Sequence, residues 1–342
     1  MTTPMPHDDD TPRVVDLAGP DGLRLRLLDR GATWWSLQVP VRGESQPREV
    51  LLGAATPTIH VTNQAYLGAT VGRVANRING ASIERDGRRW PLQPQRGSRH
   101  QLHGGPDGYD RRRWTLLRAG TDSACFGLQS PPLDQGFPGA LAVEVEVWLR
   151  GGGVVEQQFR ATCTAPTPVC LTNHAYFNLD GTTSDVRAHR LQIDASHWAP
   201  VDDELIPLGL LRPVDGTALD FRSVRSIGSL ADGRYDHGLL LRPAPQPLQQ
   251  AAATLQSADG RLRMRLSTTL PALQLYTGQH LGGQPARDGG LLPPHAGVAL
   301  EPEWLPDSVH HPEWPQPDCW LQPGQRWLHT LRLQFDSPAD TP

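Results

Sequence analysis

Histidine and carboxyl side chains lie next to short apolar runs in this chain, where they could exchange protons with a bound molecule. His174 lies in residues 167–179, TPVCLTNHAYFNL, where a buried strand is expected. Its neighbours Asn173, Tyr176 and Asn178 are hydrogen-bonding groups, which a purely structural core strand does not need. A pocket for a hydroxylated ligand does need them. The alternative for His174 is a hydrogen-bonded histidine of the core.

A carboxyl group ends another apolar run. Glu301 follows the sequence GVAL at 297–300, so we expect its side chain to be partly buried. Burial raises the pKa of a carboxyl group and makes it a candidate general base. The alternative is a glutamate at a strand end that faces water.

Two glycine-containing segments offer donors. Asn76 and Arg77, in residues 68–78, place an amide beside a fork of N–H groups that suits paired oxygens. His103 precedes two glycines in residues 102–110, where backbone or ligand can approach closely. The alternatives are a turn with solvated arginines and a β-turn with a surface histidine.

A fourth candidate is the dipeptide Asp236-His237. Adjacent residues of a strand point to opposite faces, so at most one of the two can face a pocket. The chain contains no GxSxG or HExxH motif, no CxxC pair and no glycine-rich nucleotide loop after a strand. We therefore expect neither a metal nor a nucleotide cofactor.

Composition limits the partners. The chain has 342 residues, and 32 Lys and Arg against 36 Asp and Glu give a net charge of −4, which does not suggest a nucleic-acid or anionic-membrane partner. No apolar run approaches the ~18 residues of a membrane helix. Residues 1–13 are polar and acidic, without the apolar region of a signal peptide. We expect a cytoplasmic protein, with a periplasmic location left open.

The elements that carry these residues are predicted to be strands. The 33 prolines and 34 glycines argue against long helices. Apolar and polar residues alternate in five stretches, at 23–27, 141–149, 155–161, 262–266 and 327–335. The triple glycine at 151–153 predicts a hairpin between two of them. This pattern indicates an all-β chain folded as a large antiparallel β-sandwich or barrel, with one domain at 13–336 and flexible tails at 1–12 and 337–342.

Seven segments together resemble the aldose 1-epimerases, the galactose mutarotase family. They occur in the family's order, and the resemblance covers about residues 20–335. The segments are GRVANRI at 72–78, LHGG at 102–105 with the following Gly108-Tyr109-Asp110 and Trp114, the stretch 167–179, VDDELIPLG at 201–209, Asp236-His237, QLYTG at 274–278, and Leu300-Glu301 with Pro306-Asp307.

The resemblance implies a single antiparallel supersandwich and an isomerase of carbohydrate metabolism that interconverts the α- and β-anomers of free aldohexoses such as glucose or galactose. It implies that Glu301 takes the proton of the anomeric hydroxyl, that His174 protonates the ring oxygen and that His103 assists. It implies no metal and no cofactor, a monosaccharide as the partner, and a monomer or homodimer. The sugar would be held by Asn76, Arg77, Tyr176, Asp236 and Gln274. The pH profile would be bell-shaped, with a carboxylate and a histidine limb.

The sequence departs from the family pattern at four positions, which puts sugar preference more in doubt than the reaction. Cys170, Gly238 and Gln279 each replace a usual Asn, and Glu303 replaces a usual Gln. On a continuous strand Glu303 would share the face of Glu301 and raise its pKa by like-charge repulsion, unless Pro302 breaks the strand.

Three alternatives remain open. A sugar-phosphate epimerase of the same fold would use an arginine cluster such as 111–113. A non-catalytic sugar-binding module would not need to keep His103, His174 and Glu301 together. A lyase or hydrolase with a similar sandwich would need a pair of carboxylates at a suitable spacing.

Overall fold

The computed structural model describes residues 11–181, 184–241 and 248–338. Most of the two predicted tails, residues 1–10 and 339–342, lies outside the described residues. At the described ends, Arg113 donates a hydrogen bond to the carbonyl of Thr11, and Arg42 donates one to the carbonyl of Pro338. Among the described residues, no helix is long and apolar enough to cross a membrane.

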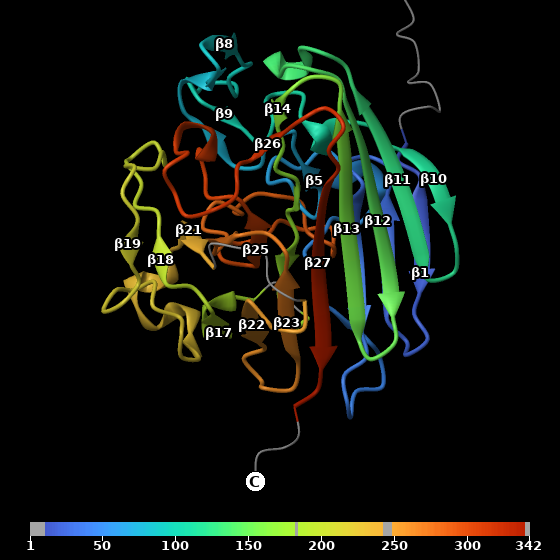
Figure 1. The fold of residues 1–342 in the computed structure, drawn as a ribbon. Coiled ribbons are helices and arrows are strands. Elements are labelled where there is room, and N and C mark those ends of the chain that lie inside the picture. Colours follow the sequence, from blue (N-terminus) through green and yellow to red (C-terminus); the bar gives the residue numbers. More distant parts are fainter. Residues whose placement is uncertain (1–10, 182–183, 242–247, 339–342) are drawn as a thin grey trace, which may run out of the picture.

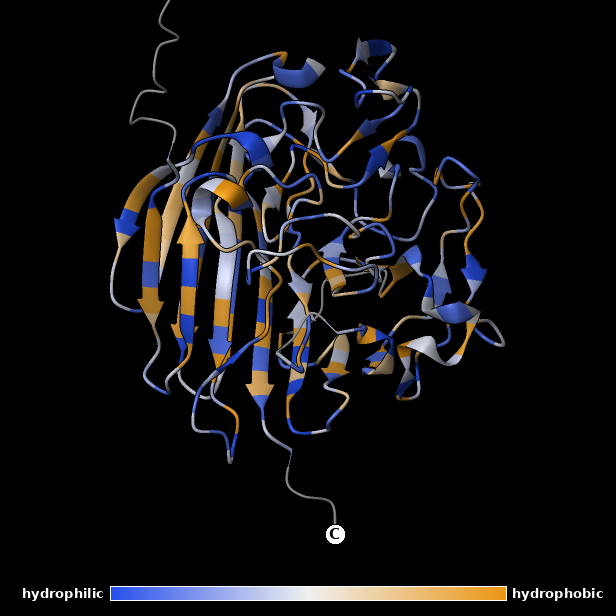
Figure 2. Cartoon of the chain, turned by 180° about the vertical axis from the view of Figure 1, so that it is seen from behind, coloured by the Kyte–Doolittle hydropathy of each residue, from blue (hydrophilic) through white to orange (hydrophobic). Residues whose placement is uncertain are grey.

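The largest element is a nine-stranded sheet in which neighbouring strands run antiparallel (Figure 1). In spatial order its strands are β10 (Thr115–Ala119), β11 (Ser123–Ser130), β12 (Leu141–Arg150), β13 (Val154–Cys163), β27 (Trp327–Asp336), β23 (Arg263–Thr268), β22 (Ala253–Gln256), β17 (Arg190–Ile193) and β20 (Arg225–Ser226). Strands β12 and β13 form the hairpin predicted around the triple glycine, with Arg150 opposite Val154. The alternation of hydrophilic and hydrophobic residues along these strands is visible in Figure 2.

A second, six-stranded sheet carries four of the candidate residues, Tyr176, Asp236, Gln274 and Glu301. Its strands are β16 (Tyr176–Phe177), β25 (Val298–Glu303), β24 (Ala272–Tyr276), β21 (Asp236–Leu240), β18 (His197–Trp198) and β19 (Arg212–Pro213), in that order. These pairs are also antiparallel. The all-β fold predicted from the alternation is therefore confirmed.

Smaller sheets complete the structure. A four-stranded sheet contains β1 (Val14–Ala18), β2 (Arg24–Leu28), β3 (Thr33–Val39) and β4 (Arg48–Glu49). The two-stranded sheets pair β5 (Thr70–Val71) with β15 (Thr172–Asn173), β6 (Arg77–Ile78) with β9 (Gln101–Leu102), β7 (Ser82–Arg85) with β8 (Arg88–Pro91), and β14 (Thr167–Pro168) with β26 (Trp320–Leu321). One short helix, α1 (Pro57–His60), lies between β4 and β5 in the described chain.

The core fills the space between the nine-stranded and six-stranded sheets. Val145 of β12, Leu275 of β24 and Leu300 of β25 belong to the same buried apolar cluster. Because side chains alternate along a strand, the residues between these apolar positions point to the opposite face of the six-stranded sheet. Gln274 and Glu301 occupy such positions, so packing of the core directs both toward the other face.

Candidate active site

A pocket of about 270 Å³ opens over that face of the six-stranded sheet. Strand pairing places Gln274 of β24 opposite Glu301 of β25, and Asp236 of β21 opposite Tyr276 of β24. The volume lies near the lower end of the ~300–1,000 Å³ of small-molecule pockets. It is lined by Gln64, Ala65, Tyr66, Asn76, Arg77, Leu102, His103, His174, Tyr176, Leu205, Asp236, Gln274, Tyr276, His280, Gln284 and Glu301.

All eight residues predicted from the sequence line this pocket, although they come from six separate segments. They are Asn76, Arg77, His103, His174, Tyr176, Asp236, Gln274 and Glu301. The structure thus brings them together, and their assignment as site residues, with their individual roles, stays a prediction.

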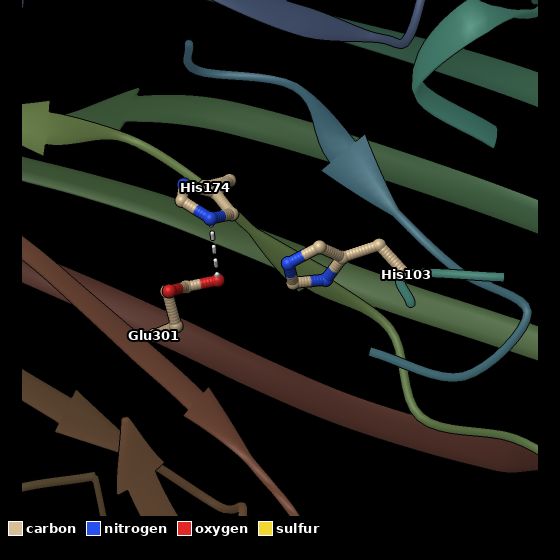
Figure 3. A group of neighbouring side chains, drawn as sticks. All are labelled: His103, His174 and Glu301. Atoms are coloured by element: carbon tan, nitrogen blue, oxygen red, sulfur yellow. Dashed lines mark ion pairs between the residues drawn. The ribbon is translucent and has the colours of Figure 1, made fainter. Parts of the chain in front are cut away.

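His103, His174 and Glu301 point toward one another at the inner end of the pocket (Figure 3). Nε2 of His174 lies 3.5 Å from Oε2 of Glu301, and the two imidazole centroids are 5.2 Å apart. His174 lies between β15 and β16, and His103 directly follows β9. All three side chains are buried.

A reciprocal backbone contact orients His103. The amide of Asn76 donates to Nδ1 of His103 at 3.1 Å, and the amide of His103 donates to the carbonyl of Asn76 at 3.0 Å. Both residues have left-handed backbone, with φ of 62° for Asn76 and 51° for His103. Such strained conformations concentrate at functional sites. The following Gly104 has no room for a side chain, because a Cβ there would lie 1.9 Å from the carbonyl oxygen of Gly72.

This contact bears on whether the three residues suit a metal ion. Their potential ligand atoms lie within 4.8 Å of one another. Nδ1 of His103 accepts an amide hydrogen, so Nε2 carries the proton of the neutral ring. A protonated nitrogen cannot coordinate a metal ion. The arrangement therefore fits proton transfer to a ligand better than metal binding.

Burial separates the proton affinities of the three groups. It raises the pKa of Glu301 well above its usual value, with the nearby carboxyls of Glu303 and Asp236 adding to the effect. Burial lowers the pKa of His174 to about 4 and that of His103 well below its usual range. Both histidines are then neutral at pH 7. Burial thus shifts the pKa of Glu301 upward and the pKa values of both histidines downward, and the bell-shaped pH profile stays a prediction.

The polar groups at the outer side of the pocket divide into acceptors and donors. Nε2 of Gln274 donates to Oδ1 of Asp236 at 2.6 Å, while Oε1 of Gln274 is buried without a hydrogen-bond partner among the described residues. The guanidinium of Arg77 reaches the pocket from the strand β6. The pocket thus presents acceptors on one side and a cationic donor on the other, a combination that suits several hydroxyl groups.

Sequence reasoning missed two aromatic residues. The ring of Tyr66 lies 4.6 Å from that of His103 and 5.6 Å from that of His174. Tyr276 packs edge-on against Tyr176 at 5.9 Å. Tyr276 belongs to the motif that supplied Gln274, and could have been found there. Tyr66 lies in no recognised motif. Trp304, three residues after Glu301, is buried, donates from Nε1 to the carbonyl of Pro317 and does not line the pocket.

The four departures from the family pattern have different surroundings. Cys170 is buried and its Sγ accepts from the amide of Trp304 at 3.4 Å. A Cβ at Gly238 would lie 2.7 Å from Cδ of Pro306. Gln279 accepts from Oγ1 of Thr277 and does not line the pocket. Strand β25 continues through Pro302, so Glu303 does share the face of Glu301.

Comparison with known proteins agrees with the resemblance seen in the sequence. Residues 13–334 match the sequence profile of the family described as aldose 1-epimerase. The chain is 44% identical to the aldose 1-epimerase of Escherichia coli (strain K12), covering 94% of this chain and 95% of that protein. It is 36% identical to the galactose mutarotase of Homo sapiens, covering 92% of each. The crystal structure of an aldose epimerase homologue from C. elegans superimposes with a TM-score of 0.89 at 28% identity, covering 96% of this chain and 100% of that chain.

Proposed function

The chain belongs to the aldose 1-epimerase family, and we propose that its pocket interconverts the α- and β-anomers of free aldohexoses such as glucose or galactose. The observation that carries this proposal is the meeting of His103, His174 and Glu301 in one pocket lined by hydroxyl-binding groups. The enzyme is an isomerase.

Anomer exchange requires a base at the anomeric hydroxyl and an acid at the ring oxygen. We assign Glu301 as the base and His174 as the acid. Glu301 takes the hydroxyl proton, His174 gives a proton to the ring oxygen, and the bond between the anomeric carbon and the ring oxygen breaks. The open-chain aldehyde rotates about its C1–C2 bond, and the reverse transfers close the ring on the other face. No net proton is gained or lost.

Burial increases the basicity of the Glu301 carboxylate and the acidity of the His174 imidazolium. Since burial raises the pKa of Glu301, its carboxylate is a stronger base than an exposed glutamate. Since burial lowers the pKa of His174, its imidazolium is a stronger acid than an exposed histidine. At pH 7 the reactive pair is the minor form in which the proton lies on His174 and Glu301, 3.5 Å away, is ionised. The Nε2–H of His103 can stabilise negative charge near the ring oxygen. A positioned acid or base typically contributes ~10²–10⁴-fold in rate.

Sugar binding falls to the groups around this centre. Asp236 and Oε1 of Gln274 accept hydrogen bonds from hydroxyls, and Arg77 donates to them. The side chain of Asn76 already donates to Glu303 and accepts from the amide of Arg77. Asn76 therefore acts mainly by holding Arg77 and His103 in place. Tyr66, Tyr176 and Tyr276 offer aromatic surface for the ring.

The sugar-phosphate alternative is not favoured. The arginines at 111–113 are engaged with protein carboxylates: Arg112 with Asp107 and Asp134, Arg113 with Asp29, and Arg111 with Asp110. The pocket is lined by one arginine, Arg77, together with the carboxyl groups of Asp236 and Glu301. The described residues that line it do not form the arginine cluster that a phosphate would require.

A non-catalytic binding module and a hydrolase are also less well supported. A binding module has no use for a base with a raised pKa beside two histidines. A hydrolase with Glu301 would need its second carboxylate across the scissile bond. Glu303 does not line the pocket, and Asp236, the second carboxyl group that does, accepts from Nε2 of Gln274 and is assigned to sugar binding. A domain at 13–336, a cytoplasmic location, and a monomer or homodimer stay predictions from the sequence.

Polarimetry tests the function directly. Freshly dissolved α-glucose, α-galactose, xylose and arabinose, and glucose 6-phosphate, are followed to equilibrium with and without the protein. We expect faster loss of optical rotation for at least one free aldose and little effect on the phosphate. Equal rates with and without protein for every free sugar would reject the proposed function.

A further inference from the structure

Glu303 is a third carboxyl group at this site, buried behind the pocket wall. We propose that Glu303 is a positioning residue whose negative charge makes Glu301 hold its proton more tightly. This inference rests on the proposed function only for the role of Glu301 as the base.

The geometry places the two carboxyl groups on one side of a single strand. Glu301 and Glu303 are two residues apart in β25 and lie opposite Gln274 and Ala272 of β24. Glu303 is fully buried and does not line the pocket. Oε1 of Glu303 accepts from Nδ2 of Asn76 at 3.0 Å, and Oε2 is buried without a hydrogen-bond partner among the described residues. Such a group cannot act on substrate directly, but its charge acts on its neighbour.

The titratable and charged groups around Glu303 come from four segments of the chain. Asp236 of β21 and Glu301 of β25 are acidic, and Arg77 of β6 is the cation whose charge acts on Glu303. Cys170, from the segment before β15, is the fourth neighbour. Burial raises the pKa of its thiol, so Cys170 stays neutral. Glu301 and Glu303 are buried and lie near the half-buried Asp236, so the three carboxyl groups resist being ionised together.

The same contacts decide which of the two glutamates ionises first. The amide of Asn76 and the charge of Arg77 both favour the ionised form of Glu303, although burial still raises its pKa to about 8. Oε2 of Glu301 accepts no hydrogen bond among the described residues, although Nε2 of His174 lies 3.5 Å away, and Glu301 is repelled by Glu303 and Asp236. The charge therefore settles first on Glu303. Glu301 keeps its proton to higher pH and, once ionised, is a stronger base than an isolated buried glutamate.

Two substitutions separate charge from shape. Glu303→Gln removes the charge and keeps an oxygen that can accept from Asn76. Glu303→Asp keeps the charge in a shorter side chain. Glu84→Gln, at an exposed glutamate of β7, is the matched control. Each protein is labelled with ¹³C at the glutamate carboxyl carbon, and the Glu301 signal is identified as the one missing from Glu301→Gln.

The measurement is the pH midpoint of the Glu301 carbon signal. We expect Glu303→Gln to lower it by about 1–3 pH units, because a like charge in a shared site raises a carboxyl pKa by amounts of this order. Glu303→Asp and Glu84→Gln should stay within about 0.5 unit of wild type. An unchanged midpoint in Glu303→Gln, or an equal fall in both Glu303 variants, would overturn the inference.

Activity measured on the same proteins provides an independent readout. If the proposed function holds, the pH at which mutarotation becomes half-maximal should move downward in Glu303→Gln with the carbon signal. If no protein accelerates mutarotation, the proposed function fails. The carbon titration still decides the role of Glu303, because it does not depend on turnover.

Discussion

The amide of Asn76 donates to Nδ1 of His103 at 3.1 Å, and this one bond decides which ring nitrogen carries the proton. With Nδ1 occupied as an acceptor, Nε2 is the donor. His103 therefore enters the pocket as a neutral N–H group of fixed direction. This is the property required to stabilise charge that develops on a ring oxygen.

Two substitutions of His103 should show whether catalysis needs its Nε2–H donor or the whole imidazole ring. We expect His103→Ala to lower kcat by about 10²–10³-fold, the usual effect of removing one such donor. His103→Gln can place an amide N–H near the former Nε2 and should lose less. Polarimetric kcat values for both variants check this. Equal losses in the two would show that the imidazole, rather than its N–H, is required.

Removing the carboxylate of Glu301 should act on the chemical step. We expect Glu301→Gln to lower kcat by about 10²–10⁴-fold, the range of a general base, with KM changed by less than about threefold. The similar size of the amide keeps the contact with His174 in place. Glu84→Gln, a surface control, should behave as wild type. Full activity in Glu301→Gln would contradict the assignment of Glu301 as the general base.

Arg77 should contribute to binding more than to turnover. Its guanidinium lines the pocket and lies outside the group formed by His103, His174 and Glu301. We expect Arg77→Gln to raise KM about tenfold with a smaller change in kcat, the pattern of an interaction made equally with substrate and transition state. Initial rates over a range of sugar concentrations separate the two constants. A fall in kcat alone would place Arg77 at the reacting atoms.

The strands could be predicted from a local pattern, whereas the full set of site residues was predicted only through the resemblance of seven ordered segments to the family. Alternation along 141–149 follows directly from one buried and one wet face, and His174 and Glu301 follow apolar runs. Tyr66 could not be predicted this way. Its contacts with His103 and His174 depend on a left-handed backbone at φ 56°, which no residue type in that segment demands. The bond between Asn76 and Glu303 joins residues 227 positions apart, a relation that spacing cannot show.

The buried histidines should make the protein sensitive to mild acid. Burial lowers the pKa of His60, His174 and His329 to about 4 each. The unfolded chain then binds more protons than the folded one between pH 6.5 and 4, so stability is present above pH 6.5 and falls as the pH drops to 4. Each histidine contributes up to ~1.4 kcal/mol per pH unit.

Urea unfolding of wild type and His60→Gln at pH 7, 5.5 and 4.5 measures this effect. Nδ1 of His60 accepts from the amide of Ala54, a bond that protonation would break. We expect the variant to be less stable at pH 7, and to lose stability less steeply on acidification. The same slope in both proteins would exclude His60 as a source of acid sensitivity.

We expect that close packing requires a glycine at position 238. The family usually has an asparagine here, and the sequence linked this departure to sugar preference. A Cβ there would lie 2.7 Å from Cδ of Pro306 and 3.4 Å from Oε1 of Gln274. We expect Gly238→Ala to lower the free energy of unfolding by about 1–3 kcal/mol, the usual cost of overpacking. Gly151→Ala, whose nearest neighbour is Cγ of Pro20 at 3.9 Å, should change it by less than about 0.5 kcal/mol.

A second substitution tests whether Pro306 is the cause. Because Cδ of Pro306 makes the closest contact, Pro306→Ala should relieve the overlap. The double variant should then be more stable than the sum of the two single changes predicts, with a coupling of about 0.5–3 kcal/mol. Urea unfolding of the four proteins of this cycle gives that coupling. Additive effects would mean that the backbone of β21, rather than the ring of Pro306, excludes a side chain at this position.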